Sequence, residues 1–169
     1  MTAAVDHLLA LGHRSHACIS GPLQTLTART RLQAWRSALQ QAGITPPLDA
    51  VAEGDNLVAG GYRACRQLLA RQVAFTALFV SNDDMAIGAL RALHEAGLSV
   101  PEQVSLFGFD DEPAAAFLSP ALSTVQIPIE QMSVSAMQQA LALASGAAVA
   151  PLAPFTGTLR LRESAGLCT

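Results

Sequence analysis

The stretch TALFVSNDDMAIGALRALHEAGLSVPEQVSLFGFDDEP, residues 76–113, decides the fold of this chain. It holds two apolar runs, 77–80 and 104–109, with a segment of helical spacing between them. Polar residues follow each run, with Asn82 after the first, while Asp110 comes after the second. A strand–helix–strand unit of this kind favours a parallel sheet, in which both strand ends lie side by side at one edge. Because open α/β sheets bind ligands at that edge, Asn82 and Asp110 are candidate ligand-binding residues.

The remaining pattern also alternates between helix and strand. It predicts helices over 3–11, 27–42, 56–71 and 83–96, and strands over 16–20, 50–53, 77–80 and 104–109. We expect Asn56 or Asp55 to cap the third helix and Leu57 to lie on its inner face. After a short helix at 112–118 the pattern changes to an extended segment, a helix and an alternating strand, over 123–129, 130–144 and 155–162. The predicted fold class is α/β with a doubly wound parallel sheet.

The chain opens on a predicted helix rather than a strand. Because a doubly wound domain usually opens on a strand, we expect this chain to begin in the middle of a longer protein.

Composition restricts the classes of protein that the chain can belong to. Hydrophobic residues make up 51% of it and charged residues 14%, which is typical of a globular protein whose surface is partly covered. The net charge is −3 and lysine is absent, so the chain lacks the basic surface of a DNA-binding protein. Three scattered cysteines and no signal-like N-terminus indicate a reducing cytoplasm, and no apolar run reaches the roughly 18 residues of a membrane span.

Several polar residues have both a structural and a functional interpretation. Asn82, Asp83 and Asp84 are either a metal site or, more commonly, one ligand contact followed by helix-capping groups. Asp110 and Asp111 are either a pair of catalytic carboxylates or a ligand contact followed by the cap of the next short helix. No nucleophile or base stands near them in the sequence.

Two further positions are open in the same way. Arg31 is either solvated or reaches the sheet edge to bind a carboxylate or a pair of hydroxyls. Asn56 either caps a helix or contacts a ligand. The four histidines are scattered and no glycine-rich phosphate motif is present, so we predict no metal and no cofactor.

Four stretches of the sequence carry a family resemblance. They are HLLALGHRSHACISGP (7–22), TARTRLQAWRSALQQAGI (27–44), the stretch 76–113 and SPALSTVQIP (119–128). Together they are similar to the effector-binding core of the lactose/galactose-type (LacI/GalR) bacterial repressors, from about His7 to Arg162. The third stretch matches a signature built around N-D-x-M-A-x-G and V-P-x-D-V-S-x-x-G-[FY]-D-[DN].

The resemblance implies a periplasmic-binding-protein-like fold (type I) of two subdomains with the effector between them. It assigns residues 2–124 to the C-terminal effector-binding subdomain, 125–148 to an otherwise absent N-terminal subdomain, and 149–169 to a return strand and tail. The DNA-binding headpiece of a complete member has no counterpart here. Arg31, Asn82 and Asp110 fall on the family's usual polar ligand contacts, and Asn56 stands where many members have an aromatic ring.

The expected function is therefore effector sensing for a transcriptional regulator, without enzymatic activity. The expected partners are a small-molecule effector, namely a sugar, operator DNA only through the missing headpiece, and a second copy in a homodimer. No membrane partner is expected. A sugar-specific solute-binding protein and a small α/β enzyme using Asp110 or Asp111 are the alternatives.

Overall fold

The computed structural model describes residues 1–168 and confirms the predicted parallel sheet. Its strands are β1 (His16–Ser20), β2 (Val51–Glu53), β3 (Ala77–Val80) and β4 (Ser105–Phe107), in the order β2-β1-β3-β4. All neighbouring pairs in this sheet are parallel. The order reverses direction at β1, because the chain adds β2 on one side of β1 and then β3 on the other. Such a reversal places a crevice at the carboxyl ends of β1 and β3.

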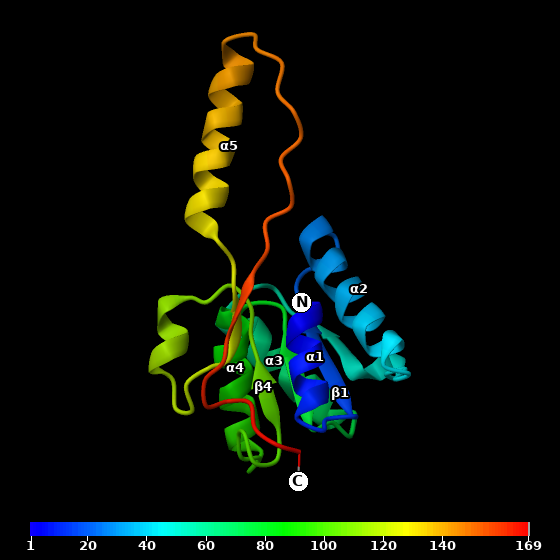
Figure 1. The fold of residues 1–169 in the computed structure, drawn as a ribbon. Helices are drawn as coiled ribbons and strands as arrows, with labels where there is room; N and C mark the ends of the chain where they lie inside the picture. Colours follow the sequence, from blue (N-terminus) through cyan, green and yellow to red (C-terminus); the bar gives the residue numbers. More distant parts are fainter. Residues whose placement is uncertain (169) are drawn as a thin grey trace.

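Helices cover both faces of the sheet (Figure 1). One face packs against α1 (Thr2–Ala10) and α2 (Leu26–Gln41), and the other against α3 (Val58–Ala70) and α4 (Asp83–Glu95). Alternate residues of a strand point to opposite faces, so the fully buried strand β1 contributes to two cores. Ala17 and Ile19 belong to the core under α3 and α4, whereas Cys18 belongs to the core under α1 and α2.

The helices α3 and α4 pack with their backbones almost touching. A Cβ atom added at Gly61 would lie 2.1 Å from the carbonyl oxygen of Met85, and one added at Gly88 would lie 1.9 Å from that of Val58. Only glycine fits at these two positions. This close approach fixes the N-terminus of α4, which has Asn82 as its N-cap residue, against the loop that precedes α3.

Side-chain hydrogen bonds cap the N-termini of α4 and α2 but not that of α3. Asn82 caps α4 by accepting a hydrogen bond from the Met85 amide, and Thr25 caps α2. The predicted cap of α3 is wrong, because Leu57 is the N-cap residue and makes no side-chain cap bond. The prediction that Leu57 lies on the inner face of α3 is also wrong, because its side chain is 61% exposed. Asp55 instead accepts a hydrogen bond from the Leu57 amide and pairs with Arg63, while Asn56 takes a left-handed φ of 67°.

Part of the C-terminal third of the chain, α5 and the segment that returns from it, projects from the compact body (Figure 1). After the 3₁₀ turn Pro113–Phe117, strand β5 (Thr124–Gln126) pairs antiparallel with β6 (Thr158–Arg160). Between these strands lies what we call the arm, residues 129–157, which contains α5 (Ile129–Ala144) and the segment that returns from it. None of the 16 residues of α5, all of which the structure describes, is buried.

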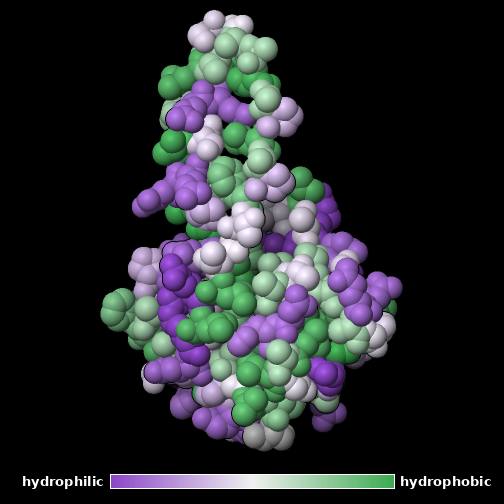
Figure 2. All heavy atoms as spheres, in the orientation of Figure 1, coloured by the Kyte–Doolittle hydropathy of each residue, from purple (hydrophilic) through white to green (hydrophobic). Residues whose placement is uncertain are grey.

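Apolar side chains lie exposed along this arm (Figure 2). Met137, Leu141 and Leu143 are 61%, 64% and 60% exposed, respectively. Glu130 is the one charged residue among residues 129–157 of the sequence. So much exposed apolar surface with so little charge is typical of a helix that packs against another protein surface in the complete assembly. Among residues 1–168, no helix has both the length and the apolar character needed to cross a membrane.

Candidate functional site

The four residues predicted from the sequence line one cavity at the carboxyl edge of the sheet. It has a volume of about 220 Å³ and is lined by Thr25, Thr27, Ala28, Arg31, Asn56, Ser81, Asn82 and Asp110. These residues come from the start of α2, the loop after β2, and the chain just beyond β3 and β4. The crevice at the reversal of strand order is therefore the place where they meet.

Arg31 and Asp110 form the charged centre of this cavity. Nη2 of Arg31 donates to Oδ1 of Asp110 at 2.9 Å, with the two side chains 21% and 23% exposed. The other terminal nitrogen of Arg31 donates to the carbonyl oxygen of Ser81, and the guanidinium lies over the ring of Phe109 at 3.9 Å from its centroid. Burial raises the pKa of the Asp110 carboxyl, and the neighbouring Arg31 opposes this rise. The pair offers donors and acceptors without a large net charge.

Asn82 and Asn56 form another part of the cavity wall. Oδ1 of Asn82 accepts the Met85 amide at 3.0 Å, and its Nδ2 donates to the backbone oxygen of Asn56 at 3.0 Å. The second hydrogen of this Nδ2 and the second lone pair of Oδ1 remain for a ligand. The side chain of Asn56 lies over Gly21, where an added Cβ atom would be 2.6 Å from its Oδ1. The amide therefore occupies its place only because residue 21 has no side chain.

Asp83 has a structural role that the sequence did not reveal. Its side chain is fully buried, with Oδ1 accepting from the Thr124 hydroxyl at 2.7 Å and Oδ2 accepting from the Glu112 amide at 2.9 Å. Burial raises the pKa of this carboxyl to about 6. Asp83 thus ties the start of α4 to the loop after β4 and to β5. Its position after Asn82 was consistent with capping alone, and nothing local in the sequence indicated partners some 30 to 40 residues away.

Asp111 does not cap the next short helix, and that prediction is wrong. The 3₁₀ turn begins after Glu112, which makes no side-chain cap bond. Asp111 instead accepts from Nη2 of Arg162 at 2.6 Å and lies 3.7 Å from Nε of Arg160. Both arginines are in or just after β6, about 50 residues away in sequence. Within residues 1–168 no group of three or more His, Cys, Asp or Glu side chains is arranged to hold a metal ion.

The cysteine thiols of the two cores are remote from this site. Cys18 and Cys65 are buried, and burial raises the pKa of each thiol to about 12. Thiols with such a high pKa are poor nucleophiles at neutral pH. Cys18 and Cys65 are therefore core side chains rather than reactive thiols.

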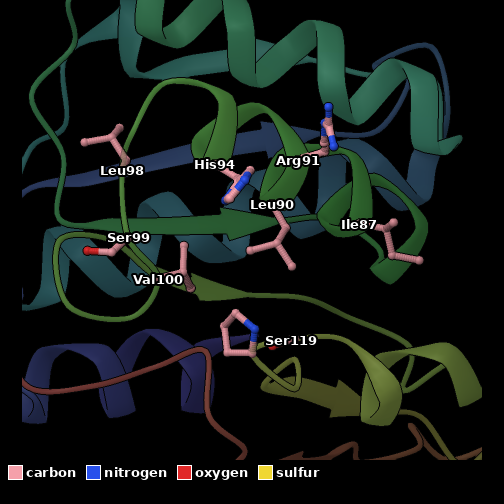
Figure 3. A pocket seen from close by; sticks show the side chains of 9 residues that line it. Ile87, Leu90, Arg91, His94, Leu98, Ser99, Val100 and Ser119 are labelled. Atoms are coloured by element: carbon pink, nitrogen blue, oxygen red, sulfur yellow. The ribbon is translucent and has the colours of Figure 1, made fainter.

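A larger hollow of about 440 Å³ lies beside α4, away from the predicted residues (Figure 3). Its lining is Ile87, Leu90, Arg91, His94, Leu98, Ser99, Val100, Ser119 and Pro120. Arg91 is already bound to Glu95 at 2.6 Å. The hollow has more apolar side chains than polar groups that could orient a ligand, whereas the smaller cavity has a convergent polar set. The smaller cavity is therefore the stronger candidate for a binding site.

Comparison with known proteins agrees with the fold. A model of the periplasmic binding protein-like domain matches residues 5–165. The transcriptional regulator AscG of Escherichia coli K12 is 40% identical over 161 residues, which are 95% of this chain and 48% of AscG. The ribose operon repressor of the same strain is 39% identical over 129 residues, covering 76% of this chain and 39% of that repressor. The chain thus spans about half or less of the length of these relatives.

Solved structures resemble this one closely. The crystal structure of the Escherichia coli repressor AscG has a TM-score of 0.88 and 39% identity, over 98% of this chain and 60% of that one. A complex of the transcriptional regulator CelR with cellobiose has a TM-score of 0.90 and 33% identity, over 95% of this chain and 49% of that one. The likeness extends over nearly the whole chain, so it includes the arm as well as the sheet.

Proposed function

This chain belongs to the periplasmic binding protein-like domain family, among the cores of the lactose/galactose-type repressors, and on that basis we propose that it senses a small-molecule effector for a transcriptional regulator. The observation that carries the proposal is the convergence of Arg31, Asn56, Asn82 and Asp110 on one cavity. The effector binds there without chemical change. Its binding energy biases the regulator between two conformations.

The chemistry of the cavity favours a neutral polyhydroxylated ligand. Arg31 and Asp110 compensate each other's charge, and their unused donor and acceptor positions suit hydroxyl groups, each of which can both donate and accept. The amides of Asn56 and Asn82 have the same dual character. The ribose operon repressor and the cellobiose complex of CelR are relatives whose names refer to sugars. We therefore assign the effector to the sugars or closely related molecules.

The division into subdomains is part of this proposal. Residues 2–124 form the subdomain that carries the cavity, 125–148 cross into a second subdomain, and 149–169 return from it. The antiparallel pair of β5 and β6, separate from the main sheet, supports a crossing point at this place. The exposed apolar side chains of α5 support a second subdomain that covers them. The cavity is then one wall of a cleft, so a ligand gains its full affinity only when the cleft is closed.

We assign no catalytic role to Asp110 or Asp111, because each carboxylate is bound to an arginine rather than placed beside a nucleophile. We place the protein in the cytoplasm, where a transcriptional regulator acts. Contact with operator DNA belongs to a separate headpiece, since this chain has 10 basic against 13 acidic residues and no lysine.

A thermal-shift screen of the protein tests the proposed function. Neutral monosaccharides, disaccharides and nucleosides are added one at a time at high concentration, because a ligand that binds only the folded state raises its melting temperature. At least one sugar-like compound should raise the melting temperature in a saturable way. A panel in which only charged metabolites or no compounds stabilise the protein would contradict the assignment.

A further inference from the structure

We propose that Asp111, held by Arg162, is a positioning residue that keeps the carboxylate of Asp110 against Arg31 and links the ligand-binding edge to strand β6. This inference rests on the proposed function, because it concerns the same cavity. The inference adds Asp111, which does not line the cavity, to the residues that shape the site. It also gives a route by which strands β5 and β6 influence the cavity.

The backbone at this corner is in an unusual conformation. Strand β4 ends at Phe107, and Asp110 and Asp111 then have φ values of 114° and 62°. Residues with side chains rarely take positive φ, and two in succession persist only where the surrounding structure holds them. The direction of the Asp110 side chain depends on this conformation. Whatever holds the two residues therefore also sets the contact between Asp110 and Arg31.

The strongest restraint on the corner is a clasp made by Asp111 and Arg162. The side chain of Asp111 is 10% exposed, and its Oδ1 accepts from Nη2 of Arg162 at 2.6 Å. Nη1 of the same guanidinium donates to the carbonyl oxygen of Leu122 at 2.8 Å, and the Arg162 amide donates to Oγ of Ser123 at 2.9 Å. Arg162 is thus anchored at both its backbone and its guanidinium, so it offers Asp111 a fixed partner rather than a mobile one.

Two further hydrogen bonds hold the residues on either side of Asp111. The Asp110 amide donates to the carbonyl oxygen of Val125 at 2.9 Å, and the Glu112 amide donates to the buried Asp83 at 2.9 Å. These bonds attach the corner to β5 and α4. The clasp alone attaches it to the chain that follows β6. Without the clasp, the corner keeps these two hydrogen bonds and a longer contact of 3.7 Å between Asp111 and Arg160, but it loses its shortest side-chain hydrogen bond.

The position of the clasp couples the strand pair β5 and β6 to the ligand-binding residue Asp110. Strands β5 and β6 run side by side where the chain enters and leaves the arm (Figure 1). Val125 of β5 holds the Asp110 amide, and Arg162 after β6 holds Asp111. A displacement of this strand pair would therefore move the Asp110 carboxylate relative to Arg31. By thermodynamic reciprocity, a ligand that fixes Asp110 also fixes the strand pair.

Amide hydrogen exchange of the 169-residue protein without any effector tests the inference. In Asp111→Asn, the Asp110 amide should exchange roughly tenfold faster or more, because its local opening becomes easier. The amides of Leu78 and Phe79 in β3 should be unchanged. The control variant is Glu95→Gln, which removes a carboxylate that also contacts two arginines, Arg91 and Arg66, on the far side of the molecule. It should leave the Asp110 amide unchanged.

Two results would overturn the inference: an unchanged Asp110 amide in Asp111→Asn, or equal acceleration of all amides, which is a purely structural effect. If Asp111→Asn does not fold, Arg162→Lys is measured in its place, since lysine keeps the charge but cannot contact Asp111 and Leu122 together. Because no effector is present, failure here leaves the proposed function standing. Failure of the sugar screen with faster exchange at Asp110 would reject the function and retain the clasp.

Discussion

At the scale of single residues, the role of Arg31 comes from neighbours that are distant in sequence. Its position near the start of α2 suggested two interpretations, a solvated side chain or a ligand contact. The structure places it between Ser81, Phe109 and Asp110, and so rejects the solvated interpretation. Its guanidinium is already bound at two terminal nitrogens. We therefore regard Arg31 and Asp110 as one unit that binds the ligand together.

Replacing Asp110 or Arg31 by alanine should weaken effector binding. Loss of one partner of a desolvated charge pair costs about 2–5 kcal/mol, and the partial exposure of this pair, 21% and 23%, favours the lower end. Calorimetry with the best ligand from the screen should show a dissociation constant raised roughly 30-fold in either variant. The double variant should lose much less than the sum of the two changes. Unchanged binding in either single variant would remove that residue from the site, and Arg91→Ala is the control.

Asp83 should make stability depend on pH. Its folded pKa of about 6 lies above the ordinary value of 3.8, so the folded state binds a proton more readily than the unfolded state. The contribution of this group to the free energy of unfolding therefore increases as pH falls from about 6 to about 4, and is constant above that window. Urea unfolding at pH 4.5 and pH 7 should show a difference, on the order of 1–3 kcal/mol, that Asp83→Asn removes. An identical pH dependence in both proteins would contradict the assignment.

The sequence predicted the residues that line the cavity better than it predicted the residues that hold them in place. Asn82 and Asp110 follow from the strand ends, because that argument needs only the order of elements along the chain. Arg31 and Asn56 came from helix starts and from the family resemblance. For Asp83 and Asp111 the sequence offers only capping, metal-binding or catalytic interpretations. Their actual partners, Thr124 and Arg162, are distant in sequence, and such pairings leave no local signal.

At the scale of elements, the apolar periodicity predicted which segments are helices and strands, but not how closely they approach. Strand β1 has the predicted bounds, and α2 differs by one residue at each end. The close contact between α3 and α4 was not predicted. Glycines such as Gly61 and Gly88 can occur within a helix for several reasons, so their presence does not by itself indicate a close helix pair. The start of α3 was also missed, because the left-handed Asn56 depends on its bond from Asn82.

Gly61→Ala should destabilise the protein more than an ordinary glycine substitution. The added methyl would lie 2.1 Å from the Met85 carbonyl oxygen, so α3 and α4 must separate, at a cost of about 2–4 kcal/mol. Gly97→Ala is the matched control, because nothing lies within 4 Å of its added Cβ atom. Only the left-handed φ of 73° disfavours alanine there, and we expect a loss of about 1 kcal/mol in the free energy of unfolding. Denaturant unfolding measures both. Equal losses in the two variants would show that the helix contact adjusts freely.

At the scale of the whole molecule, the body and the arm differ in character. The body has two buried cores on either side of its sheet, whereas α5 contributes no buried residue. The resemblance predicted a segment that crosses to another subdomain, and the exposed apolar face of α5 is what such a segment requires. Sequence periodicity alone predicted the helix correctly but not its projection from the body, because the pattern does not say which surface covers it.

We predict that the 169-residue protein forms a homodimer through its arm. Exposed Met137, Leu141 and Leu143 provide an apolar surface that a second copy can cover, either by packing or by exchange of arms. Size-exclusion chromatography with light scattering should give twice the mass of 17.6 kDa. Met137→Glu with Leu141→Glu should give a monomer. A wild-type protein that is monomeric at all concentrations would show the prediction to be wrong.

The central claim is that the sheet edge at Arg31, Asn56, Asn82 and Asp110 binds the effector. Its most direct test is a titration of the ¹⁵N-labelled protein with a sugar from the screen, followed by the chemical shifts of backbone amides and of the asparagine side chains. We predict that the changes are concentrated at these four residues and Thr27, with weak, roughly millimolar affinity because one wall binds alone. Changes concentrated instead around Ile87, Leu90 and His94, with these four residues unaffected, would contradict the account.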